Sequence, residues 1–313
     1  MTFHNKIRFH RGSNPDFWWN RKLTLKRILL NGDQMPTTKK IYVNASDFAK
    51  YTGDNTYCSP EEIHTSFWSS NKGLALAFGI ECKPRCKTSV DEFISNCNEA
   101  DKERLSAVLG SASSLDEGSN LDSDLSHALS TKLVAPAVFE ITNHSSMKAL
   151  EKCTNQVNES LPSELGARVK QAASKDAQRQ RGIHKEKYSI NKFSKASGKT
   201  VQCTNRLLST RLCDWNGYTV MLRGMVDGMM DTGEVIEVKE RRRRLFNRVV
   251  TYENVQLHCY MKLTDTKRAM LREQYDETSK EYWVDFDADF WEERIRMLLD
   301  FLQKTMPDST SSV

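Results

Sequence analysis

The second half of the chain has the clearest alternation of apolar and polar positions. Segments from Thr200 to Cys213 and from Tyr218 to Met229 follow the period of two that half-buried strands require. Asn216-Gly217 lies between them, and this dipeptide favours a tight hairpin turn. A second turn, Asp231 to Gly233, precedes a short strand from Glu234 to Lys239 that is rich in β-branched residues. The pattern predicts a sheet built from hairpins.

Helical periodicity surrounds these strands. Helices are predicted from Ser163 to Ala196, from Thr251 to Leu263 and from Asp287 to Lys304. Strands are predicted near Lys267 to Tyr275 and Glu281 to Phe286. The last helix is expected to turn Phe290, Ile295, Leu298, Leu299 and Leu302 inward. The order predicts an α/β (α+β) fold with a central mixed β-sheet flanked by helices.

The first half is predicted to be a mostly helical cover. A short strand, Lys40 to Val43, precedes a helix that begins near Asp47, and a second helix is expected near Pro60 to Phe78. The Ser- and Asp-rich stretch 111–130 is predicted to be a flexible loop. The predicted domain limits are therefore 1–110 for the helical region, 131–306 for the core and 307–313 for a disordered tail.

Composition narrows the class of protein. Hydrophobic residues make up 38% and charged residues 28% of 313, which is typical of a soluble globular protein. The longest mostly apolar run, Gly73 to Ile80, is too short to cross a bilayer, and the first residues lack the apolar segment of a secretory signal. We therefore expect a non-secreted intracellular protein without a membrane partner, in a compartment that the sequence leaves open. The formal net charge of +5 permits a nucleic-acid partner without requiring one.

The eight cysteines are scattered and are expected to be reduced thiols. Cys82 and Cys86, with Cys97 as a third ligand, offer an alternative zinc site. No second close pair of ligands follows, as a structural zinc site would require. We therefore favour the free thiols.

Candidate chemistry gathers in the segment from Arg223 to Arg244. Glu237 and Lys239 are two residues apart on a strand, so their side chains share a face, with Cα atoms roughly 7 Å apart. Hairpin pairing can bring Asp227 beside Glu237. Two adjacent carboxylates repel each other unless a cation separates them, and Mg²⁺ prefers carboxylate oxygens together with water and phosphate. The carbonyl of Val238 is a further candidate ligand, although a lone Glu-x-Lys pair is more often an exposed hairpin face.

Two further elements strengthen this hypothesis. Glu186 falls on a predicted helical stripe with Ile183, Ile190 and Phe193, where an acid needs a partner such as a metal. Gln256 and Tyr260, four residues apart, point the same way from their helix and could meet a phosphate or base edge. A salt-bridged surface Glu and ordinary packing are the plainer alternatives.

Arginines follow the candidate site directly. Guanidinium groups bind phosphate bidentately, although a basic run is more often a solvated surface. The residues predicted to contact DNA are Arg181, Arg241, Arg242, Arg243, Arg244 and Arg248.

These segments together resemble the PD-(D/E)XK nuclease superfamily, and within it the YqaJ-type viral recombinase family that includes phage lambda exonuclease. The likeness is carried by RGIHKE, GMVDGMMDTGEVIEVKERRRRLF, YENVQLHCYM and WVDFDADFWEERIRMLLDFL, within roughly Ile183 to Leu302. NASDFAKYTGDNTY is similar to the family's opening helix. The chain departs from the superfamily motif in having Val226, not Pro, before Asp227.

The resemblance implies a restriction-endonuclease-like core and assigns roles. Glu186 matches the helix acid, Asp227 the first strand acid, and Glu237 with Lys239 the ExK pair. Gln256 and Tyr260 match the QxxxY element of RecB-like members. One or two Mg²⁺ or Mn²⁺ ions, held by Glu186, Asp227, Glu237 and Val238, would support hydrolysis of DNA.

The implied activity is an exonuclease that processes double-stranded DNA ends in recombination, repair or replication. The resemblance also leaves room for a homo-oligomer and for a single-strand annealing protein as partner. Alternatives are a structure-specific or single-strand endonuclease and, in another class, a non-catalytic DNA-binding protein on the same fold. Strand polarity and an RNA substrate also stay open.

Overall fold

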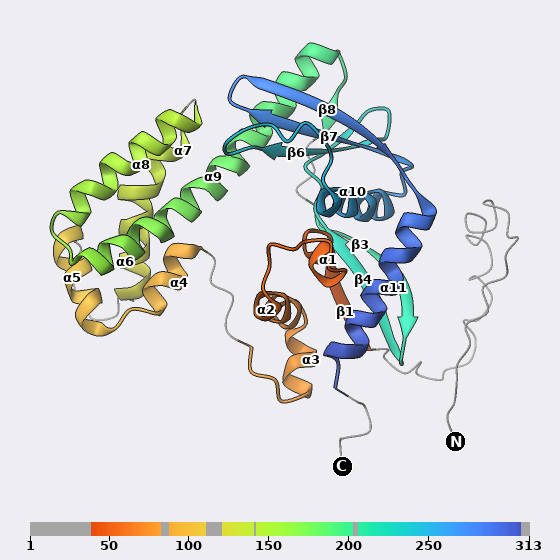
Figure 1. Cartoon of the computed structure of the whole chain (residues 1–313), viewed down its shortest axis with the longest axis horizontal. Coiled ribbons are helices and arrows are strands. Elements are labelled where there is room, and N and C mark those ends of the chain that lie inside the picture. Colours follow the sequence, from red (N-terminus) through yellow and green to blue (C-terminus); the bar gives the residue numbers. More distant parts are fainter. Residues whose placement is uncertain (1–38, 83–87, 111–120, 141, 203–205, 308–313) are drawn as a thin grey trace, which may run out of the picture. The chain divides into compact units, whose positions relative to one another are not determined.

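The strands fall into two mixed sheets in the computed structural model, which describes residues 39–82, 88–110, 121–140, 142–202 and 206–307 (Figure 1). The first sheet has the order β1-β4-β3 and the second the order β2-β5-β6-β7-β8. The strands are β1 (Lys39–Asn44), β2 (Val201–Gln202), β3 (Leu208–Trp215), β4 (Tyr218–Gly224), β5 (Gly228–Met230), β6 (Val235–Glu240), β7 (Arg268–Tyr275) and β8 (Thr278–Asp285). In each sheet one pair is parallel, β1 with β4 and β6 with β7.

Helices flank both sheets, so the predicted fold class is confirmed. The helices are α1 (Ala45–Tyr51), α2 (Pro60–Ser70), α3 (Lys72–Ala77), α4 (Ser89–Ser95), α5 (Glu99–Leu109), α6 (Leu121–Leu129), the π-helical segment η4 (Ser130–Val134), α7 (Ala135–Val138), α8 (Asn143–Asn158), α9 (Ser163–Ser197), α10 (Thr251–Thr264) and α11 (Ala288–Thr305). Within the described residues, no helix combines the length and the apolar character that a bilayer span would need.

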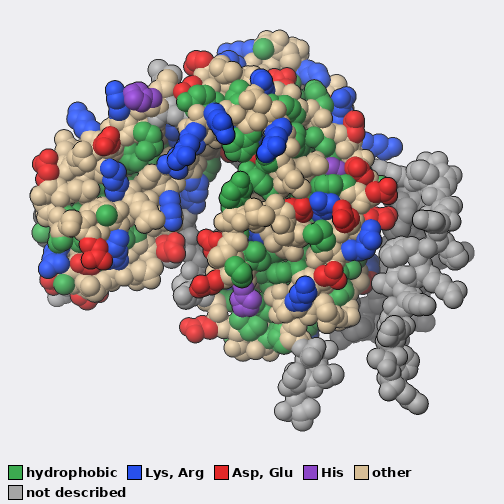
Figure 2. Space-filling model, in the orientation of Figure 1, with side chains coloured by type: hydrophobic (Ala, Val, Ile, Leu, Met, Phe, Trp, Pro, Cys, Tyr) green, Lys and Arg blue, Asp and Glu red, His purple; other side chains and the backbone are tan. Residues whose placement is uncertain are grey.

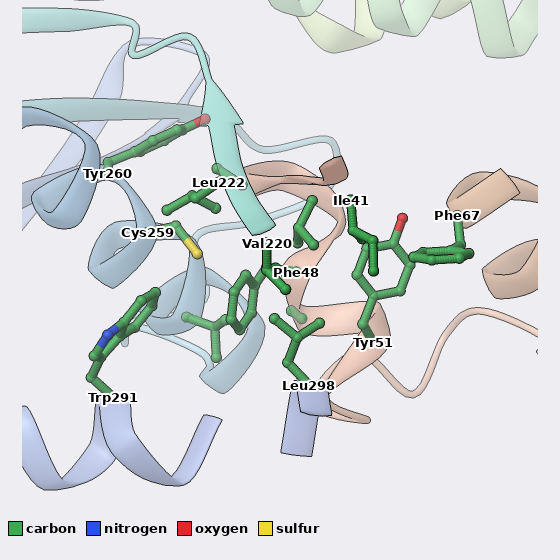
Figure 3. Close-up of a cluster of buried hydrophobic side chains, with 14 of the residues drawn as sticks. Ile41, Phe48, Tyr51, Phe67, Val220, Leu222, Cys259, Tyr260, Trp291 and Leu298 are labelled. Carbon is green, nitrogen blue, oxygen red and sulfur yellow. The ribbon is translucent and has the colours of Figure 1, made fainter. Parts of the chain in front are cut away.

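The largest core lies between α1, α10 and α11 and the strands they cover (Figure 3). Phe48 stacks on Trp291 with ring centroids 5.4 Å apart, and Tyr51 stacks on Phe301 at 4.9 Å. These contacts join the start of the described chain to its last helix. Because β1 also pairs with β4, residues near the N-terminal end of the described chain complete the same core as the second half of the sequence. The predicted domain limits are not otherwise tested and stay a prediction.

A second core is purely helical. It joins α4 to α8 with the first part of α9, through buried leucines, valines and alanines. Leu125 and Leu129 of α6 belong to it, so the second half of the loop predicted at 111–130 is helical, while residues 111–120 lie outside the described residues. Apolar residues spaced four apart outweigh the polar composition between them.

The strand expected from Tyr218 to Met229 is in fact two strands in different sheets. The hairpin turn before it is confirmed, with Asn216 and Gly217 both at positive φ. The chain leaves the first sheet at Gly224 and enters the second at Gly228. A Cβ at Gly224 would lie 2.9 Å from the Cβ of Ala45, and one at Gly228 would lie 2.6 Å from Val201 Cγ1. Only glycine fits this crossing without a shift of its neighbours.

The helix expected from Pro60 to Phe78 is also interrupted. A capping box at Ser59 and Glu62 begins α2, as the sequence pattern favours. Asn71 ends it, because its side chain accepts from the N–H of Tyr42 at 2.7 Å and donates to the Tyr42 carbonyl at 2.9 Å. The Asn71 side chain thus pairs with main-chain groups at the edge of β1, and the next helix, α3, begins after it.

Candidate active site

Strand β6 presents different side chains to its two covering helices. Ile236 and Val238 pack with Ile190 and Phe193 of α9, while Val235 belongs to the core that contains α10. Since side chains alternate along a strand, Glu237 and Lys239 lie on the α10 face. The apolar residues of β6 thus fix which polar residues meet α10.

Asp227 lies in the crossing between β4 and β5, beside the middle of β6. Its Oδ2 accepts the main-chain N–H of Val238 at 2.8 Å. The N–H of Arg241 donates to the Gln274 carbonyl, so the odd-numbered residues of β6 direct their main-chain groups toward β7. The carbonyl of Val238 therefore lies on the other edge of β6, the edge that Asp227 approaches.

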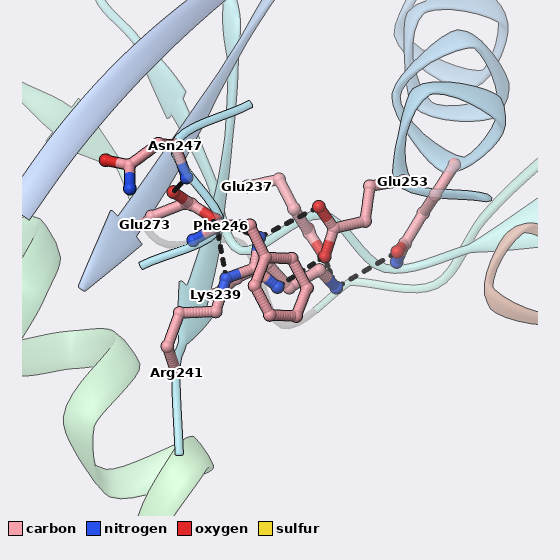
Figure 4. Close-up of polar contacts among 8 residues, drawn as sticks. Glu237, Lys239, Arg241, Phe246, Asn247, Glu253 and Glu273 are labelled. Atoms are coloured by element: carbon pink, nitrogen blue, oxygen red, sulfur yellow. Dashed lines mark hydrogen bonds and ion pairs between the residues drawn. The ribbon is translucent and has the colours of Figure 1, made fainter. Parts of the chain in front are cut away.

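A chain of hydrogen bonds fixes the amine of Lys239 (Figure 4). Its Nζ donates to Glu237 Oε1 at 2.5 Å and to Gln256 Oε1 at 3.0 Å. The amide of Gln256 in turn donates to the hydroxyl of Tyr260 at 2.7 Å. The structure thus brings together the Glu-x-Lys pair and the Gln and Tyr of α10, which the sequence placed on one helical face.

The acids of this cluster are held in environments that disfavour their charged forms. Glu237 is 3% exposed, and its Oε2 is buried without a hydrogen-bond partner among the described residues. Burial, with a contribution from Asp227, raises the pKa of Glu237 to about 8. Burial and then Glu186 raise the pKa of Asp227, and burial and then Glu237 raise the pKa of Glu186. A bound cation would offset the repulsion between these neighbouring acids.

The amine of Lys239, unlike the acids, is held in its charged form. Burial alone would lower the pKa of its amine, but the carboxylate of Glu237 raises it above the ordinary lysine value. The amine therefore stays protonated at neutral pH and acts as a hydrogen-bond donor and positive charge.

The donor set fits a divalent cation in part. The carboxylate oxygens of half-buried Asp227 and buried Glu237, with Glu237 Oε2 lacking a partner, and the adjacent Val238 carbonyl are the kind of oxygen ligands that Mg²⁺ and Mn²⁺ accept. Among the residues that the structure describes, however, no three His, Cys, Asp or Glu side chains are grouped so that they could hold a metal ion. Glu186 interacts with the charges of the other two acids, and its part in a three-carboxylate metal site stays a prediction.

The helical stripe predicted around Glu186 is only partly present. Ile190 and Phe193 are buried, but Ile183 is 55% exposed. The buried apolar residues of α9 belong to the helical core as far as Ala177 and to the core beside the second sheet from Ile190 onward, so apolar positions such as Ile183 between them are uncovered. Glu186 lies in this stretch and is half-buried.

Two of the predicted DNA-binding arginines are internal instead. Arg241 is 7% exposed and donates to both oxygens of Glu253, at 2.6 and 2.9 Å, and to Glu273 (Figure 4). Arg181 is 4% exposed and pairs with Glu240 at 3.0 Å. Neither guanidinium is available to phosphate, because a buried charge requires its partner.

The remaining arginines, Arg242, Arg243, Arg244 and Arg248, are exposed. They lie on a loop whose main chain is held by Glu273, which accepts the N–H groups of Phe246 and Asn247 at 3.1 Å each. On the face drawn in Figure 2, basic and acidic side chains are intermingled over many elements, in line with the mild net charge. With four exposed arginines, the loop is a local concentration of positive charge.

Glu253 and Glu273 are structural residues of the site that the sequence analysis missed. Glu253 occupies the third position of α10, where an acid favours the helix dipole. Glu273 stands in β7 between buried neighbours, and an acid inside a buried strand signals a buried partner.

The alternative zinc site lies only partly within the described residues. Cys82 belongs to the margin of the largest core and Cys97 to the helical core, while Cys86 lies outside the described residues. The six cysteines within the described ranges are free thiols.

Comparison with known proteins assigns no family. No family model and no curated protein matches the chain. An alkaline exonuclease (LHK-Exo) from Laribacter hongkongensis is similar in structure, at 13% identity and a TM-score of 0.36, covering 56% of this chain and 90% of its own. The same exonuclease in complex with dAMP gives 13% identity and a TM-score of 0.33, covering 56% and 85%. The protein SSO0001 gives 12% identity and a TM-score of 0.32, covering 68% and 89%. Likeness at this level assigns no reaction, so a function can be inferred only from the side chains of this chain.

Proposed function

We propose that the chain is a metal-dependent nuclease that hydrolyses phosphodiester bonds in DNA, acting as an exonuclease on double-stranded ends. The observation that carries the proposal is the pair of acids, half-buried Asp227 and buried Glu237, with the protonated amine of Lys239 held beside them by Gln256. Such a cluster suits a reaction in which negative charge develops on a phosphate.

Asp227, Glu237 and the carbonyl of Val238 would hold Mg²⁺ or Mn²⁺, with Glu186 as a further acid nearby. When bound, the metal would lower the pKa of a water molecule and stabilise the leaving oxygen. Lys239 donates hydrogen bonds to the attacking water or to a phosphate oxygen. Gln256 holds the amine in place, and Tyr260 fixes the amide of Gln256.

The exposed arginines of the loop that follows β6 supply contacts to the DNA backbone. The first of these arginines, Arg242, is three residues after Lys239, and Arg243, Arg244 and Arg248 follow. A DNA strand in the site would therefore pass close to them. Contacts to phosphates position a duplex without reading its sequence. We therefore expect little sequence preference at the cleaved end. The formation of a homo-oligomer and the binding of a single-strand annealing protein stay expectations that rest on the sequence alone.

The test is cleavage of a linear duplex labelled at either end of each strand. Purified protein is incubated with Mg²⁺, with Mn²⁺ or with EDTA, and product lengths are followed in time. We expect mononucleotides to be released from one end in the presence of metal only. Internal fragments would indicate an endonuclease, parallel reactions on single-stranded DNA and RNA define the substrate, and no cleavage with either metal would refute the proposal.

A further inference from the structure

Tyr57 is a large exposed aromatic residue close to the candidate active site. Its side chain is 84% exposed, more than any other large hydrophobic residue within the described part of the chain. An isolated surface tyrosine needs no explanation. This one is presented by an anchored loop, and its neighbours are residues of the site.

The loop before Tyr57 is fixed to the last helix. Arg294 of α11 makes a two-point contact with Asp54, at 2.9 Å between Nη2 and Oδ1 and 3.3 Å between Nε and Oδ2. Thr52 adds a hydrogen bond to the same carboxylate at 2.7 Å. Both members of this ion pair are largely buried, with side-chain exposures of 13% and 8%. The pair therefore holds the loop more firmly than a surface contact would.

The main chain on both sides of Tyr57 is held as well. The N–H of Tyr57 donates to Asn55 Oδ1 at 3.2 Å, and Asn55 is tied to α1 through the carbonyl of Ala49 at 2.9 Å. Two residues later, Ser59 forms the capping box that begins α2. The ring is thus exposed at a position where little conformational freedom remains to be lost on binding.

The ring of Tyr57 meets the active-site helix. It packs edge to face against Tyr252, with centroids 6.2 Å apart and an interplanar angle of 89°. Tyr252 lies one turn before Gln256 on α10, and its phenol is close enough to Glu253, Arg241 and Lys239 to interact with their charges. An edge-to-face contact leaves most of the Tyr57 ring uncovered.

Basic side chains lie near this pair. Lys239, whose side chain is 26% exposed, is held by Gln256 one turn after Tyr252. Arg241 is buried against the residue after Tyr252, and the exposed Arg242, Arg243 and Arg244 follow it directly. Aromatic rings beside a basic path are the arrangement that binds single-stranded nucleic acid, because bases stack on the rings while the charges hold phosphates. This combination favours a nucleic acid over a protein as the occupant.

We infer that Tyr57, supported by Tyr252, is a stacking platform for an unpaired base of the DNA strand that enters the active site. The inference rests on the proposed function and adds to it: the substrate strand carries an unpaired base beside Lys239. An enzyme acting on duplex ends would then fray the terminal pair and hold the released base on Tyr57. Stacking of one base contributes about 5- to 100-fold in affinity.

The test uses short single strands with 2-aminopurine at one end or the other, in EDTA so that nothing is cleaved. Fluorescence of 2-aminopurine falls when the base stacks. We expect quenching with the wild type, and with Tyr57→Ala a loss of quenching and about 5- to 100-fold weaker binding. Tyr57→Phe keeps the ring and should behave like the wild type. Leu76→Ala, which truncates a residue that is 82% exposed on α3, is the matched control and should change neither readout.

Equal quenching by Tyr57→Ala and the wild type would overturn the platform, as would no quenching by the wild type. Because the side chain is exposed, the variants should keep the melting temperature of the wild type. A wild type that quenches but never cleaves with Mg²⁺ or Mn²⁺ would overturn the nuclease proposal and leave the platform standing. Failure to bind any oligonucleotide would overturn both and point to a protein partner for the ring pair.

Discussion

The side chain of Glu237 is an acid in surroundings that disfavour its charged form. It is an acid on a central strand, buried on the face that meets α10, with one oxygen unpartnered and a pKa raised to about 8. A buried acid costs stability unless something compensates it. Residues that serve function commonly carry such a cost.

Replacing Glu237 with glutamine should separate function from stability. The amide is nearly isosteric, its oxygen can still accept the hydrogen bond from Lys239 Nζ, and the cost of desolvating the Glu237 carboxylate disappears. We expect cleavage to fall by at least about 100-fold, a typical loss for a catalytic group. The melting temperature, measured by calorimetry without divalent ions, should stay level or rise. A large drop in melting temperature would instead assign Glu237 a structural role.

The sequence predicted the polar cluster better than the buried ion pairs. Glu237, Lys239, Gln256 and Tyr260 meet because strand and helix periodicities are local rules that can be applied to a sequence. Arg241 was misassigned because its burial depends on Glu273, 32 residues away. Local pattern does not specify such a partner.

At the scale of elements, the loop between β6 and α10 is anchored at its start and middle and exposed in between. Arg241 is tied to α10 and β7, and Glu273 holds the main chain of Phe246 and Asn247. The intervening arginines therefore project from a fixed main chain.

Removing Arg242, Arg243 and Arg244 together, each to alanine, should weaken DNA binding evenly across sequences. Fewer phosphates are then neutralised and fewer counterions released, so the slope of log K against log salt should decrease in magnitude by about 2 to 3. Titrations at several salt concentrations measure it. Lys148, Lys152 and Lys170, exposed on α8 and α9, give a control with the same change of charge. Equal slopes for the arginine variant and the wild type would exclude this loop from the DNA path.

Helices α10 and α11 are joined by a buried histidine. His258 Nδ1 contacts the Asn254 carbonyl at 2.9 Å, and its Nε2 accepts the N–H of Asp287 at 3.1 Å. Burial lowers the pKa of His258 below 6.5, against smaller opposing effects of Asn254 and Asp287, while Arg294 lowers it further. The neutral ring is therefore the form that the joint requires.

This joint should make stability depend on pH. The unfolded chain binds a proton more readily than folded His258, so the stabilisation is fully present above pH 6.5 and is lost as pH falls toward the lower folded pKa. Melting temperatures between about pH 5 and about pH 8 should show this slope in the wild type. His258→Gln retains an acceptor for Asp287 and should flatten it. An identical slope in the variant would assign the dependence to another group.

Element boundaries were predicted well where turn chemistry is local. The Asn216-Gly217 hairpin, α10 and the closing helix lie within a few residues of their predicted limits. The division of Tyr218 to Met229 between two sheets depends on the neighbours that crowd Gly224 and Gly228. The break at Asn71 depends on the edge of β1. Both are tertiary effects that no local pattern encodes.

At the scale of the whole molecule, the candidate site is assembled from distant parts of the sequence. The crossing at Asp227, strand β6 and helix α10 supply its polar groups, and α9 brings Glu186 near. The start of the described chain, through β1 and α1, covers the same core. The α/β class could be predicted from the order of elements, whereas the separate helical core and the two-sheet arrangement could not.

The most direct test of the account is Lys239→Met, which keeps an unbranched side chain one atom shorter than lysine and removes its charge. Cleavage of end-labelled duplex DNA with Mg²⁺ is compared with that of the wild type, alongside binding of the same duplex in EDTA. We predict a loss of cleavage of at least about 100-fold with binding changed by less than about tenfold. Cleavage by the variant at the rate of the wild type would contradict the assignment of the active site.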